Sequence, residues 1–75
     1  MLTPKLNLRG IPCPLNLVQA KIAIEGIAVG DVLEIELDAG EPIRNVPVSL
    51  GRQGQEILET TPCRDYFCVK IRKRL

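Results

Sequence analysis

The amino-acid sequence predicts an α/β fold, a two-layer α/β sandwich with the order β-α-β-α-β-β. In this fold a four-stranded mixed sheet carries two helices on one face. Three observations lead to the prediction. Short segments of alternating apolar and polar residues are separated by two longer segments with apolar residues at helical spacing. Glycine and proline fall between these segments. The chain has 75 residues, and we expect residues 1–75 to form a single domain with one core.

The first half of the chain predicts a strand, a helix and a second strand. Polar and apolar residues alternate over residues 5–9, and Gly10 ends this strand. Pro14 suits the first position of a helix, which continues to about Ile27. Residues 32–38 again alternate, which is typical of a strand that is buried on one face only.

The first predicted helix carries two apolar stripes, although one stripe is enough to pack against a sheet. One stripe consists of Leu17, Ala20, Ile24 and Ile27. The other consists of Leu15, Val18 and Ile22. The second stripe either widens the buried face or forms a docking surface. We favour the wider buried face.

The second half of the chain predicts a helix followed by two strands. The helix opens at residues 39–42 and should be shortened or kinked at Pro47, which lacks a backbone N–H. Residues 56–61 and 66–72 have the pattern of strands. Residues 61–65 are expected to form the turn that joins them.

The composition excludes several classes of chemistry. The chain has no histidine, which removes histidine-based catalytic triads and histidine-ligated metal sites. Its three cysteines show no Cys-x-x-Cys spacing, so we expect neither a zinc site nor any other metal centre. An odd number of cysteines also argues against a disulfide framework.

Charge and hydropathy bear on partners and location. A net charge of +1 does not favour direct binding of nucleic acid. No segment is long and apolar enough to cross a bilayer. The first five residues lead into a strand pattern and not into a secretory leader, so we expect the protein in the cytoplasm, without membrane contact.

Cys13 is the candidate nucleophile. At a helix N-terminus its thiol would meet the positive end of the helix dipole and free backbone N–H groups, which favour the thiolate. Pro12 and Pro14 stiffen the loop, and Arg9 is close enough in sequence to stabilise the thiolate. The alternative, of equal weight on the residues alone, is that Cys13 is a small buried apolar residue.

The segments around Cys13 and further along the chain resemble the TusA/SirA family of small sulfur-carrier proteins. The resemblance covers almost the whole chain and rests on Leu8-Arg9-Gly10-Ile11-Pro12-Cys13-Pro14-Leu15-Asn16, residues 30–35, residues 40–47, residues 54–58 and residues 69–73. The predicted element order also matches the two-layer sandwich of that family.

The resemblance implies a sulfurtransferase function without a cofactor. Cys13 matches the family's persulfide-bearing cysteine, and Pro14 matches its invariable neighbour. A donor, such as a cysteine desulfurase or a rhodanese-type protein, would load sulfur onto Cys13, and an acceptor protein would remove it. Acceptors in the family serve tRNA thiolation, sulfur oxidation or synthesis of sulfur-containing cofactors. We expect the chain to act as a monomer.

Two positions depart from the common family pattern. Asn16 stands where the family motif Cys-Pro-x-Pro has its second proline, and the chain resembles a Cys-Pro-Leu-Asn subgroup. Gln55 stands where the family often has histidine, so no imidazole assists the thiol. Attack of a thiolate on a persulfide does not require one.

Other residues support competing hypotheses. Cys63 is expected in a turn, where we interpret it as incidental, and Cys68 is expected to point away from the helices. Besides the sulfur carrier, a second hypothesis is a non-catalytic module that binds protein or RNA through the open sheet face and the basic C-terminal end, which contains Lys70, Arg72, Lys73 and Arg74. A third hypothesis is a redox pair among the three thiols.

Overall fold

The secondary structure follows the hydrophobic pattern, and the predicted order β-α-β-α-β-β is confirmed. In the computed structural model, which describes residues 4–75, the elements are β1 (Lys5–Asn7), α1 (Leu15–Glu25), β2 (Val32–Asp38), α2 (Glu41–Arg52), β3 (Glu56–Cys63) and β4 (Tyr66–Arg72). The expectation that the first five residues form no secretory leader falls partly on residues 1–3, which lie outside the described residues.

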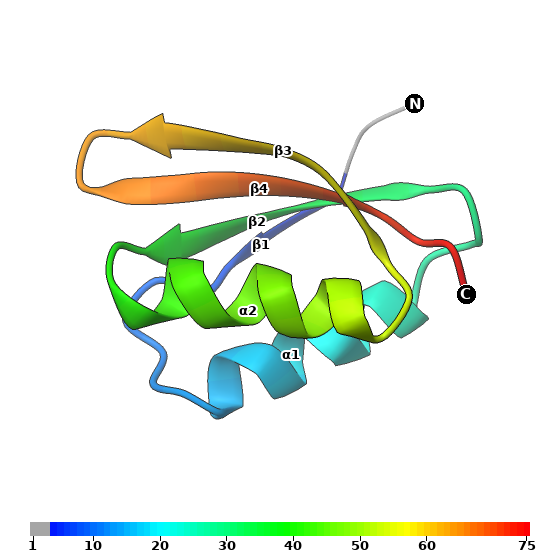
Figure 1. Ribbon diagram of the computed structural model, residues 1–75, viewed down its shortest axis with the longest axis horizontal. Coiled ribbons are helices and arrows are strands. Elements are labelled where there is room, and N and C mark those ends of the chain that lie inside the picture. Colours follow the sequence, from blue (N-terminus) through cyan, green and yellow to red (C-terminus); the bar gives the residue numbers. More distant parts are fainter. Residues whose placement is uncertain (1–3) are drawn as a thin grey trace.

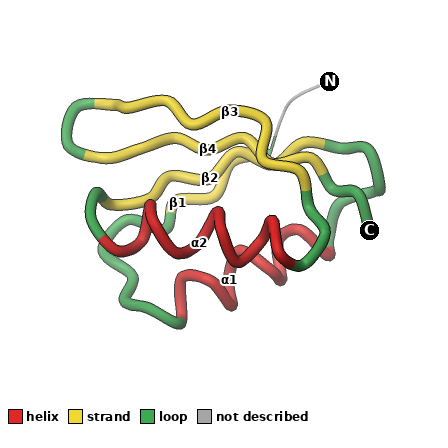
Figure 2. Tube along the Cα trace, viewed as in Figure 1, coloured by secondary structure: helices red, strands yellow, loops and turns green. Residues whose placement is uncertain are grey.

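The four strands form one mixed sheet in the order β1-β2-β4-β3. Strand β1 is parallel to β2, whereas β4 is antiparallel to both β2 and β3. Both helices lie on the same side of this sheet, below it in the view of Figure 1. The described chain therefore has two layers, and the opposite face of the sheet, here called the open face, carries no helix (Figure 2).

The core lies between the sheet and the two helices. Alternation along β2 turns every second side chain toward the helices, and the same holds for β4. The helices contribute the apolar stripes that face the sheet. The buried apolar residues are Leu8, Ala20, Ile24, Leu33, Ile35, Leu37, Val46, Leu50, Val69 and Ile71.

The second apolar stripe of α1 does not join this core. Leu15, Val18 and Ile22 are 48%, 45% and 64% exposed, so the interpretation that they widen the buried face is wrong. The reason is the geometry of a single layer of helices. The sheet covers only one side of α1, and the stripe of Ala20 and Ile24 already occupies that side.

Two prolines lie inside regular elements: Pro62, which we expect in the turn, and Pro47, which we expect to shorten or kink its helix. Strand β3 continues through Pro62 to Cys63, and only residues 64–65 form the turn. An edge strand tolerates proline because one side of its backbone needs no hydrogen-bond donor. Helix α2 continues through Pro47 to Arg52 and is not shortened.

Candidate functional site

Cys13 lies in the loop between β1 and α1, directly before the N-cap residue Pro14. Its side chain is exposed, so the interpretation of Cys13 as a buried apolar residue is wrong. The Cys13–Pro14 peptide bond is cis. The thiol therefore stands at the start of α1, as the sequence predicts, and solvent or a partner can reach it.

Two contacts hold the loop that precedes Cys13. The backbone N–H of Gly10 donates a hydrogen bond of 2.7 Å to Oδ2 of Asp38, at the end of β2. Gly10 has a φ of 77°, a conformation that favours glycine. The side chain of Ile11 packs against the core. The loop is therefore held both to the end of β2 and to the core, which limits the positions that the thiol can take.

The first turn of α1 uses its own backbone donors. The N–H of Asn16 bonds to the carbonyl of Pro12 at 3.1 Å, and the N–H of Val18 bonds to the carbonyl of Pro14 at 3.1 Å. The N–H of Leu17 donates to Oδ1 of Asn16 at 2.7 Å. Because these three groups are engaged, electrostatic support for a thiolate at Cys13 would come from the helix dipole as a whole.

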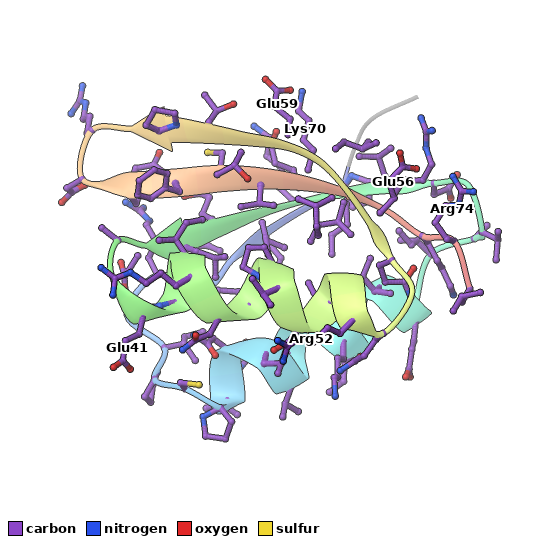
Figure 3. All side chains as sticks on the ribbon, viewed as in Figure 1. Glu41, Arg52, Glu56, Glu59, Lys70 and Arg74 are labelled. Carbon is purple, nitrogen blue, oxygen red and sulfur yellow. The ribbon has the colours of Figure 1, made fainter. Side chains whose placement is uncertain are left out.

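Cys13 helps to line an open depression of about 530 Å³. Residues of two loops line it, namely Gly10, Ile11, Pro12, Cys13, Asp38, Ala39, Glu41 and Pro42. Strands β1 and β2 are parallel, so the loops that follow them meet at one edge of the sheet. Glu41 marks this end of α2 in Figure 3. Both helices thus begin at the depression.

The sequence analysis missed the residues from the second loop. The sequence predicts Asp38 only as the last residue of a strand, and residues 39–42 only as the start of a helix. The parallel pairing of β1 and β2 was the signal that could have found them. Two parallel strands that are each followed by a helix present both loops at the same edge.

Arg9 is engaged away from the depression. Its Nε lies 3.2 Å from Oε1 of Glu36, and its guanidinium carbon lies 4.2 Å from the ring centre of Tyr66. Its Nε also lies 3.4 Å from Oδ1 of Asn7. The structure does not show Arg9 at Cys13, and a role there would require these contacts to break.

The basic C-terminal residues also have partners within the chain. Lys70 pairs with Glu59, and both Arg72 and Arg74 pair with Glu56. Figure 3 shows the side chains of Glu59 and Lys70 together above the sheet. Lys73 donates to backbone carbonyls at the end of α1. Two carboxylates thus offset part of the charge of the four basic residues, and Lys73 is held against α1, which leaves fewer free cations for contacts with RNA phosphates.

Gln55 has a structural contact of its own. Its Oε1 accepts a hydrogen bond of 2.8 Å from the backbone N–H of Arg74. Among residues 4–75, no group of three or more metal-ligating side chains lies together. Within the same range, no helix has the length and hydropathy to cross a membrane.

Comparison with known proteins identifies the family. The model of the family described as Sulfurtransferase TusA matches residues 4–73. The chain belongs to this family. A proposed sulfur carrier protein of Archaeoglobus fulgidus is 32% identical over 53 residues, which cover 71% of this chain and 60% of that protein. A second proposed sulfur carrier protein of the same organism is 33% identical over 69 residues, 88% of this chain and 90% of its own length.

Solved structures agree with the TusA-family fold. A SirA-like protein from Desulfitobacterium hafniense superposes with a TM-score of 0.75 at 21% identity, over 97% of this chain and all of that chain. A Helicobacter pylori protein superposes with a TM-score of 0.77 at 16% identity, over the same shares. At these identities the likeness concerns the fold alone. The site must therefore be argued from this chain's own residues.

Proposed function

We propose that this TusA-family chain carries sulfane sulfur as a persulfide on Cys13 and relays it to an acceptor protein. The observation that carries the proposal is the exposed thiol of Cys13 in the lining of an open depression, where two helices begin. An open site suits a protein that must present one atom to two different partners. An enclosed pocket would suit a small substrate instead.

The transfer needs no cofactor. The Cys13 thiolate attacks the outer sulfur of a donor persulfide, the donor's S–S bond breaks, and the donor leaves as a thiolate. The product is a persulfide on Cys13. An acceptor nucleophile then attacks its outer sulfur, and the Cys13 thiolate is the leaving group. The two steps have the same chemistry, and neither requires an external oxidant.

Donor and acceptor are proteins in this proposal. The donor is a cysteine desulfurase or a rhodanese-type protein, and the exchange takes place in the cytoplasm, where thiols stay reduced. Pro12 and Pro14 limit the backbone freedom of the loop. The thiol therefore loses little conformational entropy when a partner binds.

Intact-mass measurement tests the proposal. After incubation with cysteine and a desulfurase, or with thiosulfate or polysulfide, the chain should gain one sulfur that a thiol reductant removes. Cys13→Ser should abolish this gain, whereas Cys63→Ser and Cys68→Ser are matched controls that should keep a reducible sulfur on Cys13. A chain that gains no sulfur from any donor contradicts the proposal.

A further inference from the structure

Cys63 and Cys68 lie together on the open face of the sheet. Cys63 is the last residue of β3 and pairs with Tyr66, while Cys68 of β4 pairs with Thr61. The two cysteines are therefore diagonal neighbours on adjacent antiparallel strands, and their side chains share one face. Their Sγ atoms are 3.2 Å apart.

Neither the sequence motif nor the Cys13 site accounts for this contact. The sequence predicts Cys63 in the turn, and a residue in a turn has no strand register that would place it beside Cys68. The strand pairing places both sulfurs at the end of the β3–β4 hairpin, half-buried on the face away from the helices. Cys13 lies in the loop that leads into α1, so the two thiol sites are separate.

The two thiols differ in their surroundings. The hydrogen bond with Cys63, partial burial and the negative charges of Glu34 and Glu36 raise the pKa of Cys68 to about 11. Both carboxylates belong to β2, which pairs with β4, and Glu36 is the direct partner of Cys68 in that pairing. Cys68 therefore keeps its proton at neutral pH. Cys63 is the last residue of the edge strand β3, beside the turn, so we assign the first attack to Cys63.

We propose that Cys63 and Cys68 form a second thiol site, a redox pair that closes reversibly to a disulfide when the chain meets a low-molecular-weight disulfide such as oxidised glutathione. The Cys63 thiolate attacks one sulfur of glutathione disulfide, and a glutathione thiolate leaves. Cys68 then loses its proton to solvent and attacks the Cys63 sulfur, and the second glutathione leaves. The pair loses two electrons, and one disulfide is reduced to two thiols.

The second step is favoured by the first. In the mixed disulfide, the sulfur of Cys63 has neither a proton nor a negative charge. Its hydrogen bond with Cys68, which is the largest cause of the raised pKa of Cys68, is therefore lost. A disulfide requires sulfurs about 2.0 Å apart, so the two Sγ atoms need to approach by only about 1 Å. Cys63 lies on an edge strand next to a two-residue turn, and neither cysteine belongs to the buried core, so the adjustment falls outside that core.

The experiment uses the full chain with Cys13→Ser, so that only the pair can react. The reduced, folded protein is incubated with oxidised glutathione, quenched with acid, alkylated and weighed. We expect a product that has lost both alkylatable thiols and carries no glutathione. Because Cys13 is absent, this result is independent of whether Cys13 carries sulfur.

A further substitution isolates the second step. With Cys68→Ser added, glutathione should remain on Cys63, and this mixed disulfide should last at least about tenfold longer than in the parent, where Cys68 is held beside it. Circular dichroism of both variants checks that they are folded. Two results of the Cys13→Ser chain would overturn the proposal. In one, both thiols stay alkylatable. In the other, a glutathione adduct lasts as long as it does when Cys68→Ser is added.

Discussion

Asn16 is the second residue of helix α1 and the last residue of the motif around Cys13. It departs from the common Cys-Pro-x-Pro pattern, and its side chain is completely buried. Its Oδ1 accepts a hydrogen bond from Leu17, while its Nδ2 has no partner among residues 4–75. A buried amide donor without a partner lowers the stability of the folded state. The position thus tolerates a polar group but leaves it incompletely satisfied.

Asn16→Asp should destabilise the fold by about 3 kcal/mol at pH 7, because it replaces a neutral amide with a buried carboxylate that has only the N–H of Leu17 as a hydrogen-bond donor. Burial raises the pKa of such a carboxyl above its unfolded value. The loss should therefore be small below pH 4 and grow as pH rises through the higher folded pKa. Denaturant unfolding at pH 4 and pH 7 measures this difference. Equal losses at both values would contradict the assignment of Asn16 as buried.

Sequence reasoning at this scale succeeded where chemistry is local. Cys13 could be placed at a helix start because prolines and helix formers surround it. The contact of Gly10 with Asp38 could not be predicted, because the two residues are 28 positions apart and meet only through the pairing of β1 with β2. Nearness in sequence predicts Arg9 beside Cys13, but in the fold Arg9 pairs with Glu36 of β2.

Helix α1 ends with a contact from the other end of the chain. It has no basic residue in its own last turn, but Lys73 donates hydrogen bonds to the carbonyls of Glu25 and Ile27, at 3.4 and 2.8 Å. A cation at the C-terminal end of a helix interacts favourably with its dipole and with its unpaired carbonyls. The C-terminal segment therefore stabilises the first helix.

Lys73→Met should lower the free energy of unfolding by about 1 kcal/mol, because it removes the charge and keeps most of the side-chain length. Lys70→Met is the matched control. Lys70 makes only an exposed ion pair with Glu59 at 3.8 Å, which contributes little. Urea unfolding of both variants gives the comparison. Equal changes in the free energy of unfolding for the two variants would mean that the contact of Lys73 with α1 does not stabilise the fold.

The two apolar stripes of α1 should respond differently to substitution. Ile22→Glu should change the free energy of unfolding by less than about 0.5 kcal/mol, because Ile22 is 64% exposed. Ile24→Ala should lower it by about 3 kcal/mol, because Ile24 is 3% exposed and its loss leaves a cavity. A large loss for Ile22→Glu, measured by the same urea titration, would show that the second stripe is covered.

The elements themselves were predictable because each has a clear period, but their surroundings were not. Alternation cannot tell an edge strand from a central one, so the sequence predicts that the strand ends before Pro62 and that Pro62 lies in the turn. Helical spacing found both stripes of α1, yet the number of layers that pack against a helix is a property of the whole fold. The Cys63–Cys68 contact was missed for the same reason, since it depends on the register of β3 and β4.

At the scale of the whole molecule, stability should fall at alkaline pH. The folded pKa of Cys68 is raised from 9.0 to about 11, and the hydrogen bond with Glu34 raises that of Lys5. Partial burial, the first cause, raises the pKa of Tyr66 as well. A group whose folded pKa is raised contributes stability that is complete below its unfolded pKa. That contribution disappears as pH rises through the folded value.

The free energy of unfolding should therefore decline from about pH 9 to pH 11, with a thiol reductant present to prevent oxidation. Cys68→Ser should reduce the steepness of this decline, because it removes one of the groups that bind protons more tightly in the folded state. Urea titrations across this range provide the measurement. A decline of the same steepness in the variant would show that Cys68 does not contribute to it.

The two edge strands of the sheet, β1 and β3, are poorly suited to pair with another strand. Strand β1 has only three residues, and β3 contains Pro62 and an irregularity in pairing between Ile57 and Glu59. Short borders, proline and bulges each hinder the addition of a foreign strand. The uncovered sheet can thus stay exposed at high protein concentration without growing into fibrils.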